Sequence, residues 1–155
     1  MNQPIQEGEL TGPYLAAALL CEKVLVEQDG VKTVIRIVDR IIHGIADENP
    51  PEVMQPFNYE LTLFIVLKNG RAKGSHPLRI VIERPDGDMK TLFQETVFFE
   101  GDMDRGCDLI CRMMMGFSIE GIYWIKVLFN EKSLTRIPLR IIYQRKFIPP
   151  PQHHV

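Results

Sequence analysis

The stretch "GIYWIKVLFNEKSLTRIPLRIIYQ", residues 121–144, is the part of the sequence that best indicates the fold. Alternate side chains of a β-strand point to opposite faces. That rule places four apolar residues on one face before the "NEKS" turn and four on the matching face after it. They are Tyr123, Ile125, Val127 and Phe129, then Ile137, Leu139, Ile141 and Tyr143. The stretch predicts a β-hairpin with one buried face. Pro138 cannot donate to a ladder, which predicts an edge there.

Shorter segments of the same kind precede this hairpin. Turn residues separate the segments 19–27, 34–42, 59–68, 78–84 and 91–100. The first two flank Asp29-Gly30, a dipeptide typical of hairpin turns. "AAALLCEKVL" alone would equally suit a helix, but the Asp-Gly turn needs a paired strand, so we predict strand. These segments predict an all-β fold, a single antiparallel β-sandwich of about eight strands.

Length and composition bound the class of protein. The 155 residues fit one domain, which we place at 13–146 between an N-terminal tail (1–12) and a Pro-rich C-terminal tail (147–155). A net charge of −2 gives no overall basic field for nucleic acid. Three cysteines are too few for a disulfide framework, which favours the cytoplasm. "YLAAALLC" (14–21) resembles the end of a lipoprotein signal, but no Lys or Arg precedes it. No apolar run is long enough to span a membrane.

The stretch "CDLICRMMMGF", residues 107–117, raises the question of a soft-metal site. As a strand it places six apolar residues on one face, so its sulfur atoms would fill core space. They are Cys107, Leu109, Cys111, Met113, Met115 and Phe117. The two cysteines would then be roughly 13 Å apart, at about 3.3 Å per residue, too far to share a metal. As a helix the cysteines could bind Cu(I) or Zn²⁺. The flanking Gly106 and Gly116 favour the short strand.

The loop "EGDMDRG", residues 100–106, carries the carboxylates Glu100, Asp102 and Asp104, which a hard cation such as Ca²⁺ could use. The alternative function is therefore a Ca²⁺-dependent ligand- or membrane-binding domain. The plain interpretation is a solvated acidic loop beside Arg105. Counting strands alternately up and down predicts that this loop shares one end of the sandwich with Asp29-Gly30, 69–76 and 130–133.

A surface for a protein partner is our leading functional expectation. Trp124 lies between Ile122 and Leu128 on the less apolar face of its strand, and Asp39 and Arg40 end another apolar segment. These five residues are the candidate contacts, although Trp124 could also be core and the Asp39–Arg40 pair could be only structural. Sheet edges offer a second route, through a partner strand or a second copy. Known catalytic and phosphate-binding motifs are absent from the sequence, so we expect no catalytic residues and no cofactor.

The segments "LLCEKVLVEQDGVKTVIRIVDRI", "FEGDMDRG" and "EGIYWIKVLFNEKSLTRIPLRIIY" are similar to a family of small uncharacterised bacterial proteins. The similarity runs over roughly residues 14–144. It implies a compact immunoglobulin-like or C2-like sandwich in the bacterial cytoplasm and implies no particular activity. The Met113–Met115 run departs from the family pattern, which weakens a family-wide metal role for 107–117.

Overall fold

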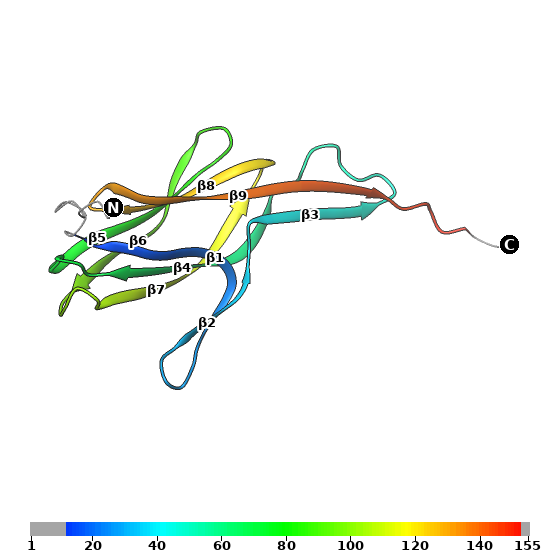
Figure 1. Ribbon diagram of the computed structural model, residues 1–155. Coiled ribbons are helices and arrows are strands. Elements are labelled where there is room, and N and C mark those ends of the chain that lie inside the picture. Colours follow the sequence, from blue (N-terminus) through cyan, green and yellow to red (C-terminus); the bar gives the residue numbers. More distant parts are fainter. Residues whose placement is uncertain (1–11, 153–155) are drawn as a thin grey trace, which may run out of the picture.

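The computed structural model describes residues 12–152, which form two β-sheets and no helix (Figure 1). The four-stranded sheet has the order β2-β1-β4-β7 and the five-stranded sheet has the order β3-β9-β8-β5-β6. The strands are β1 (Tyr14–Val26), β2 (Lys32–Ile37), β3 (Arg40–Asp47), β4 (Phe57–Lys68), β5 (Gly74–Glu83), β6 (Met89–Phe99), β7 (Gly106–Phe117), β8 (Gly121–Phe129) and β9 (Lys132–Phe147). The predicted all-β class is confirmed. Residues 1–11 of the predicted N-terminal tail and residues 153–155 of the predicted C-terminal tail lie outside the described residues.

Strands β8 and β9 form the hairpin predicted for residues 121–144. Its two-residue turn consists of Asn130 and Glu131, with φ angles of 47° and 62°. Positive φ at both central residues is the type I′ geometry, whose twist suits antiparallel strands. The predicted apolar face of β8 is buried throughout, from Tyr123 to Phe129.

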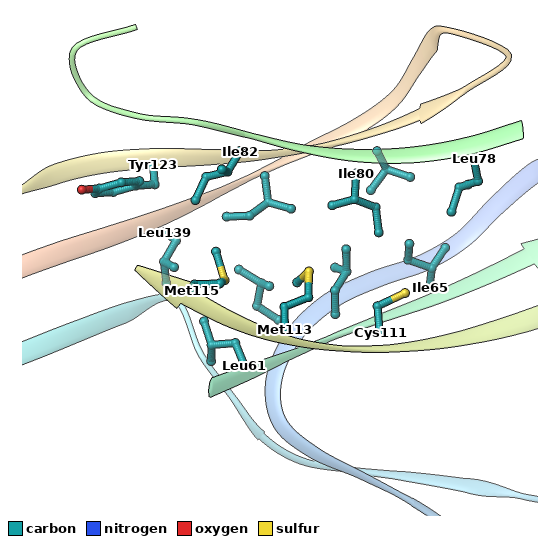
Figure 2. Close-up of a cluster of buried hydrophobic side chains, with 14 of the residues drawn as sticks. Leu61, Ile65, Leu78, Ile80, Ile82, Cys111, Met113, Met115, Tyr123 and Leu139 are labelled. Carbon is teal, nitrogen blue, oxygen red and sulfur yellow. The ribbon is translucent and has the colours of Figure 1, made fainter. Parts of the chain in front are cut away.

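The core lies between the two sheets, and side chains from both point into it (Figure 2). Leu61 and Ile65 of β4 face Ile80 of β5 and Leu139 of β9 across this space. The segment 107–117 is strand β7, as predicted. The sulfur-bearing side chains of Cys111, Met113 and Met115 lie in this layer and fill space in the core.

The prediction of a purely antiparallel sandwich of about eight strands is wrong at β3. The segment 34–42, predicted as one strand, breaks at Val38–Asp39. The Val38 N–H still bonds to the Leu20 carbonyl in the first sheet, whereas the Asp39 carbonyl accepts the Arg140 N–H in the second. The chain therefore changes sheets between these two residues, and β3 pairs with β9 in parallel. Alternation in the sequence does not reveal such a change, because both pieces carry the same pattern.

The last part of β9 extends beyond β8 and is accompanied there by β3 (Figure 1). β8 begins at Gly121, opposite Ile141, so that within the described residues β9 from Ile142 to Phe147 pairs only with β3. We call this two-stranded segment, residues 42–47 with 142–147, the ribbon. The edge predicted at Pro138 is confirmed, because pairing of β9 with β3 starts only at Arg140.

The distribution of loops between the two ends is partly as predicted. Asn69 and Arg105 are joined by a backbone hydrogen bond, and Asn130 bonds to Pro77, so the loops after β4, β6 and β8 share one end. Asp29-Gly30 does not join them. β1 begins beside Lys68 at that end and runs away from it. The predicted proximity of Asp29 to the acidic loop is therefore wrong, because the sheet change after β2 alters the count of strand directions.

Candidate partner surface

Trp124 lies on the outer face of the five-stranded sheet, away from the core. Its side chain is half-buried, and its cross-strand neighbours are Glu83 on β5 and Pro138 on β9. The guanidinium carbon of Arg136 lies 4.5 Å from the centre of the indole ring. A cation over an indole face is attracted by the negative face of the ring. Trp124 is therefore both accessible and oriented by a neighbouring arginine.

The other predicted contact residues lie on the same face. Ile122 and Leu128 occupy the same outward-facing set of positions on β8 as Trp124, and both are half-buried. Ile122 lies opposite Arg140, which in turn lies opposite Arg40 on β3. Asp39, just before β3, forms an exposed ion pair with Arg40, with 3.2 Å between Oδ1 and Nε. The structure thus places Arg40 and the three β8 residues on one face, with Asp39 at its margin.

Ion pairs balance the charge on the β5 side of this face. Lys126 pairs with Glu83, and Arg79 with Glu131, with 2.6 Å between Nη2 and Oε2 in the second pair. The hydrogen bond from Arg79 lowers the pKa of the Glu131 carboxyl. Within residues 12–152 neither Arg136 nor Arg140 forms an ion pair. The β9 side is therefore the more positive. We call Ile122, Trp124, Leu128, Arg136 and Arg140 the Trp124 surface.

The acidic loop 100–105 is organised by its main-chain carbonyls. The buried Asn69 side chain donates to the carbonyl oxygens of Glu100, at 2.5 Å, and Asp102, at 3.3 Å. The Lys73 ammonium donates to the Gly101 carbonyl. An amide and an ammonium thus occupy the carbonyl positions that a bound cation would use. No group of three or more His, Cys, Asp or Glu side chains in the described part of the chain is placed to hold a metal. The Ca²⁺ hypothesis for Glu100, Asp102 and Asp104 gains no support from this geometry.

The cysteine hypothesis also loses support. Cys107 lies opposite Leu67 and Cys111 opposite Leu63 along the same strand pair, so the two thiols lie four positions apart on extended chain. Burial raises the pKa of the Cys107 thiol and raises that of Cys111 to about 11. Desolvation also raises the pKa of Cys21, whose thiol donates to the Thr62 carbonyl. Thiolates are the reactive and metal-binding form, and these sites disfavour them.

A feature that sequence reasoning missed is the base of the ribbon. His43 stacks on Phe57, with ring centres 4.0 Å apart, and the Tyr143 hydroxyl donates to the Pro51 carbonyl at 2.7 Å. The Glu120 carboxylate accepts the Tyr143 N–H, also at 2.7 Å. Apolar alternation does not mark the ribbon in the sequence, because the run of alternating apolar residues ends at Tyr143 and Arg145 takes the next position.

Comparison with known proteins gives a family but no activity. The model of a family of unknown function (DUF6941) matches residues 16–142. No curated protein matches the chain. One similar solved structure is the alkylpurine DNA glycosylase AlkC of Pseudomonas fluorescens bound to DNA containing an abasic site analog, with 12% identity and a TM-score of 0.36. The match covers 81% of this chain and 30% of that chain. A likeness this distant supports no conclusion. In residues 12–152 no helix has the length and apolarity to cross a membrane.

Proposed function

The chain belongs to this family of unknown function, DUF6941, and we propose that it is a non-catalytic protein-binding module. The observation that carries the proposal is the Trp124 surface. It combines a half-buried tryptophan, two aliphatic neighbours and two arginines on one open sheet face. Trp and Arg are enriched among the residues that dominate binding energy at protein interfaces. Asp39 and Arg40 extend the contact at its β3 side.

An immunoglobulin-like arrangement is the finer fold that we propose. Strands β1, β4 and β7 correspond to A, B and E of that fold, and β9, β8, β5 and β6 correspond to G, F, C and C′. The Tyr123 hydroxyl donates to the Ile119 carbonyl at 2.8 Å, and the Ile119 N–H donates back to the hydroxyl. This is the tyrosine corner typical of strand F in immunoglobulin-like domains. The C2-like alternative has no matching feature.

The proposal also covers the setting of the protein. The three cysteines, Cys21, Cys107 and Cys111, are free thiols, which suits a reducing bacterial cytoplasm. The partner is a protein, which docks on the Trp124 surface or joins an open sheet edge. Self-association through a sheet edge belongs to the same proposal. Binding to nucleic acid is not part of it, because the chain carries a net charge of −2.

Site-specific cross-linking tests the partner surface. A photo-reactive residue replaces Leu128 in the full chain, and the protein is irradiated in lysate of its source organism. A captured protein is then purified and titrated against the wild type and the Trp124→Asp variant. Loss of a tryptophan at the centre of an interface costs at least about 2 kcal/mol, so the affinity should fall by roughly 30-fold or more.

Met114→Asp is the matched control. Met114 is 65% exposed on the outer face of the other sheet, so this variant makes the same kind of change away from the Trp124 surface. Its affinity should equal that of the wild type. A partner that binds Trp124→Asp and wild type equally well, with both proteins folded, would show that this face is not the interface.

A further inference from the structure

Among residues 12–152, no strand pairs with the edge of the ribbon that continues the β8 side of β9. The Tyr143 N–H points to the β8 side of β9, where the Glu120 carboxylate accepts it. The N–H groups of Arg140 and Ile148 point to the opposite side, where the carbonyls of Asp39 and Asp47 accept them. Main-chain groups alternate between the two sides of a strand. Arg145 and Phe147 therefore present their N–H and C=O groups to the open side. An isolated pair of strands has marginal stability in water. Parallel strands in particular are normally covered by other parts of the protein.

The charge of this edge indicates what would bind it. β9 carries five basic residues and no acidic one over Lys132–Phe147. Arg145 and Lys146 are exposed on opposite faces of the ribbon, next to the open main-chain groups. Phe147, 65% exposed, adds an apolar contact beside Arg145, whose guanidinium carbon lies 5.9 Å from the ring centre. An incoming strand would meet positive charge on both of its faces.

Glu120 shows how the edge accepts a carboxylate. Its Oε1 accepts a hydrogen bond from the Tyr143 N–H, which is the first donor on this side of β9 past Gly121, the first residue of β8. A second copy suits the edge less well. Pairing β9 with the same strand of another molecule would place Arg145 and Lys146 beside their counterparts, and like charges in cross-strand positions destabilise a sheet.

We propose that the open edge of β9, residues 142–147, binds an extended acidic segment of another protein by strand addition, with carboxylates beside Arg145 and Lys146. Main-chain hydrogen bonds to Arg145 and Phe147 give affinity, and the two charges give specificity. This inference rests on the proposed protein-binding function and adds the edge and the chemistry of the partner.

Peptide titration of the full chain tests it. The probe is a capped hexapeptide, Ile-Glu-Glu-Val-Thr-Val, followed by the amide signals of the isotope-labelled protein. Two further peptides have Lys in place of both Glu, or N-methyl groups on alternate residues. The acidic peptide should shift the Arg145 and Phe147 amides and slow their exchange with water. The other two should bind at least about tenfold more weakly.

Charge reversal locates the site. The double variant Arg145→Glu with Lys146→Glu should weaken binding of the acidic peptide by roughly tenfold. Arg71→Glu with Lys90→Glu makes the same charge change at two exposed positions off the ribbon and should leave the affinity unchanged. Equal binding by both double variants would overturn the proposal, as would equal binding of the Lys or N-methylated peptide.

Three further outcomes separate the alternatives. A single-stranded oligonucleotide that displaces the peptide and shifts the same amides more strongly would make the edge a nucleic-acid contact and overturn the proposal. Dimerisation in sedimentation, abolished by the ribbon variant, would assign the edge to a second copy instead. Shifts confined to Trp124 and its neighbours would overturn the edge proposal and leave the proposed function standing.

Discussion

Asn69 is a fully buried polar side chain that fixes the acidic loop. Its amide nitrogen bonds to the carbonyls of Glu100 and Asp102, and its main-chain N–H bonds to Arg105. One residue thereby joins the end of β4 to the loop before β7. The Asn69 side chain thus holds the loop carbonyls together, a role that the sequence had suggested for a cation.

Asn69→Ala should therefore destabilise the fold. The substitution leaves two partly buried carbonyls without their donor, which costs about 1 to 2 kcal/mol. Urea denaturation measures the change in the free energy of unfolding. Asn58→Ala, at an exposed position of β4, serves as the control and should change stability by less than about 0.5 kcal/mol. Equal stability of the two variants would refute this role for Asn69.

Cys111 links stability to alkaline pH. Burial raises its pKa from an ordinary 9.0 to about 11, so the folded state favours the neutral thiol. A raised folded-state pKa contributes stability that is complete below about pH 9 and is lost as the pH rises to about 11. This rise in the pKa corresponds to about 2 to 3 kcal/mol of stability.

Cys111→Ala should flatten this alkaline decline. The free energy of unfolding, measured by urea denaturation from pH 7 to pH 11, should fall less steeply in the variant than in the wild type. Met113→Ala removes a side chain from the same core face without removing a titrating group, and it should keep the wild-type slope. A wild-type slope in Cys111→Ala would contradict the assignment.

Among the connections between strands, the corner between β7 and β8 is held by the side chain of Tyr123. Its hydroxyl satisfies both the N–H and the C=O of Ile119, and its ring meets Phe117 edge-on with centres 5.0 Å apart. Tyr123→Phe keeps the ring and removes only the corner hydrogen bonds. We expect a loss of about 1 to 3 kcal/mol in the free energy of unfolding.

Tyr143→Phe is the natural comparison. It also loses one hydroxyl hydrogen bond, to Pro51, but Tyr143 lies at the base of the ribbon, where water replaces the bond. We expect a loss below about 1 kcal/mol. Thermal denaturation of both variants ranks them. If Tyr143→Phe proves the more destabilising, the corner is not the stronger anchor.

At the scale of the whole molecule, stability should be distributed unevenly. β4 lies between β1 and β7, and β8 lies between β5 and β9, so their main chains are paired on both sides and buried by the core. Residues 144–147 have one partner strand and exposed side chains. Local opening is easiest where few buried contacts hold the main chain.

Amide hydrogen exchange should show this gradient. Amides of Leu63 and Ile125 should exchange only through global unfolding, and those of Arg145 and Phe147 should exchange fastest within β9. The measurement is the exchange rate of each amide in the native protein at neutral pH. Protection of Arg145 equal to that of Ile125 in the free protein would mean that the ribbon edge is already covered.

Sequence pattern was enough to predict the all-β class, the hairpin of β8 and β9, and the inward face of β7, including Cys111 and Met115. Each depends on side chains that alternate every two residues along one strand, a property of local geometry. The same alternation placed Ile122, Trp124 and Leu128 on the outer face together. Local pattern was therefore sufficient for the faces of single strands.

The neighbours of each strand could not be predicted in the same way, because they depend on how distant segments pack. Nothing in residues 34–42 marks the change of sheet at Val38–Asp39, because pairing of β3 with β9 joins segments about a hundred residues apart. That pairing brought Arg40 beside Arg140, created the ribbon and moved Asp29 away from the acidic loop. Sheet order is set by long-range burial and by free main-chain groups, and a pattern of period two is the same whichever neighbour a strand takes.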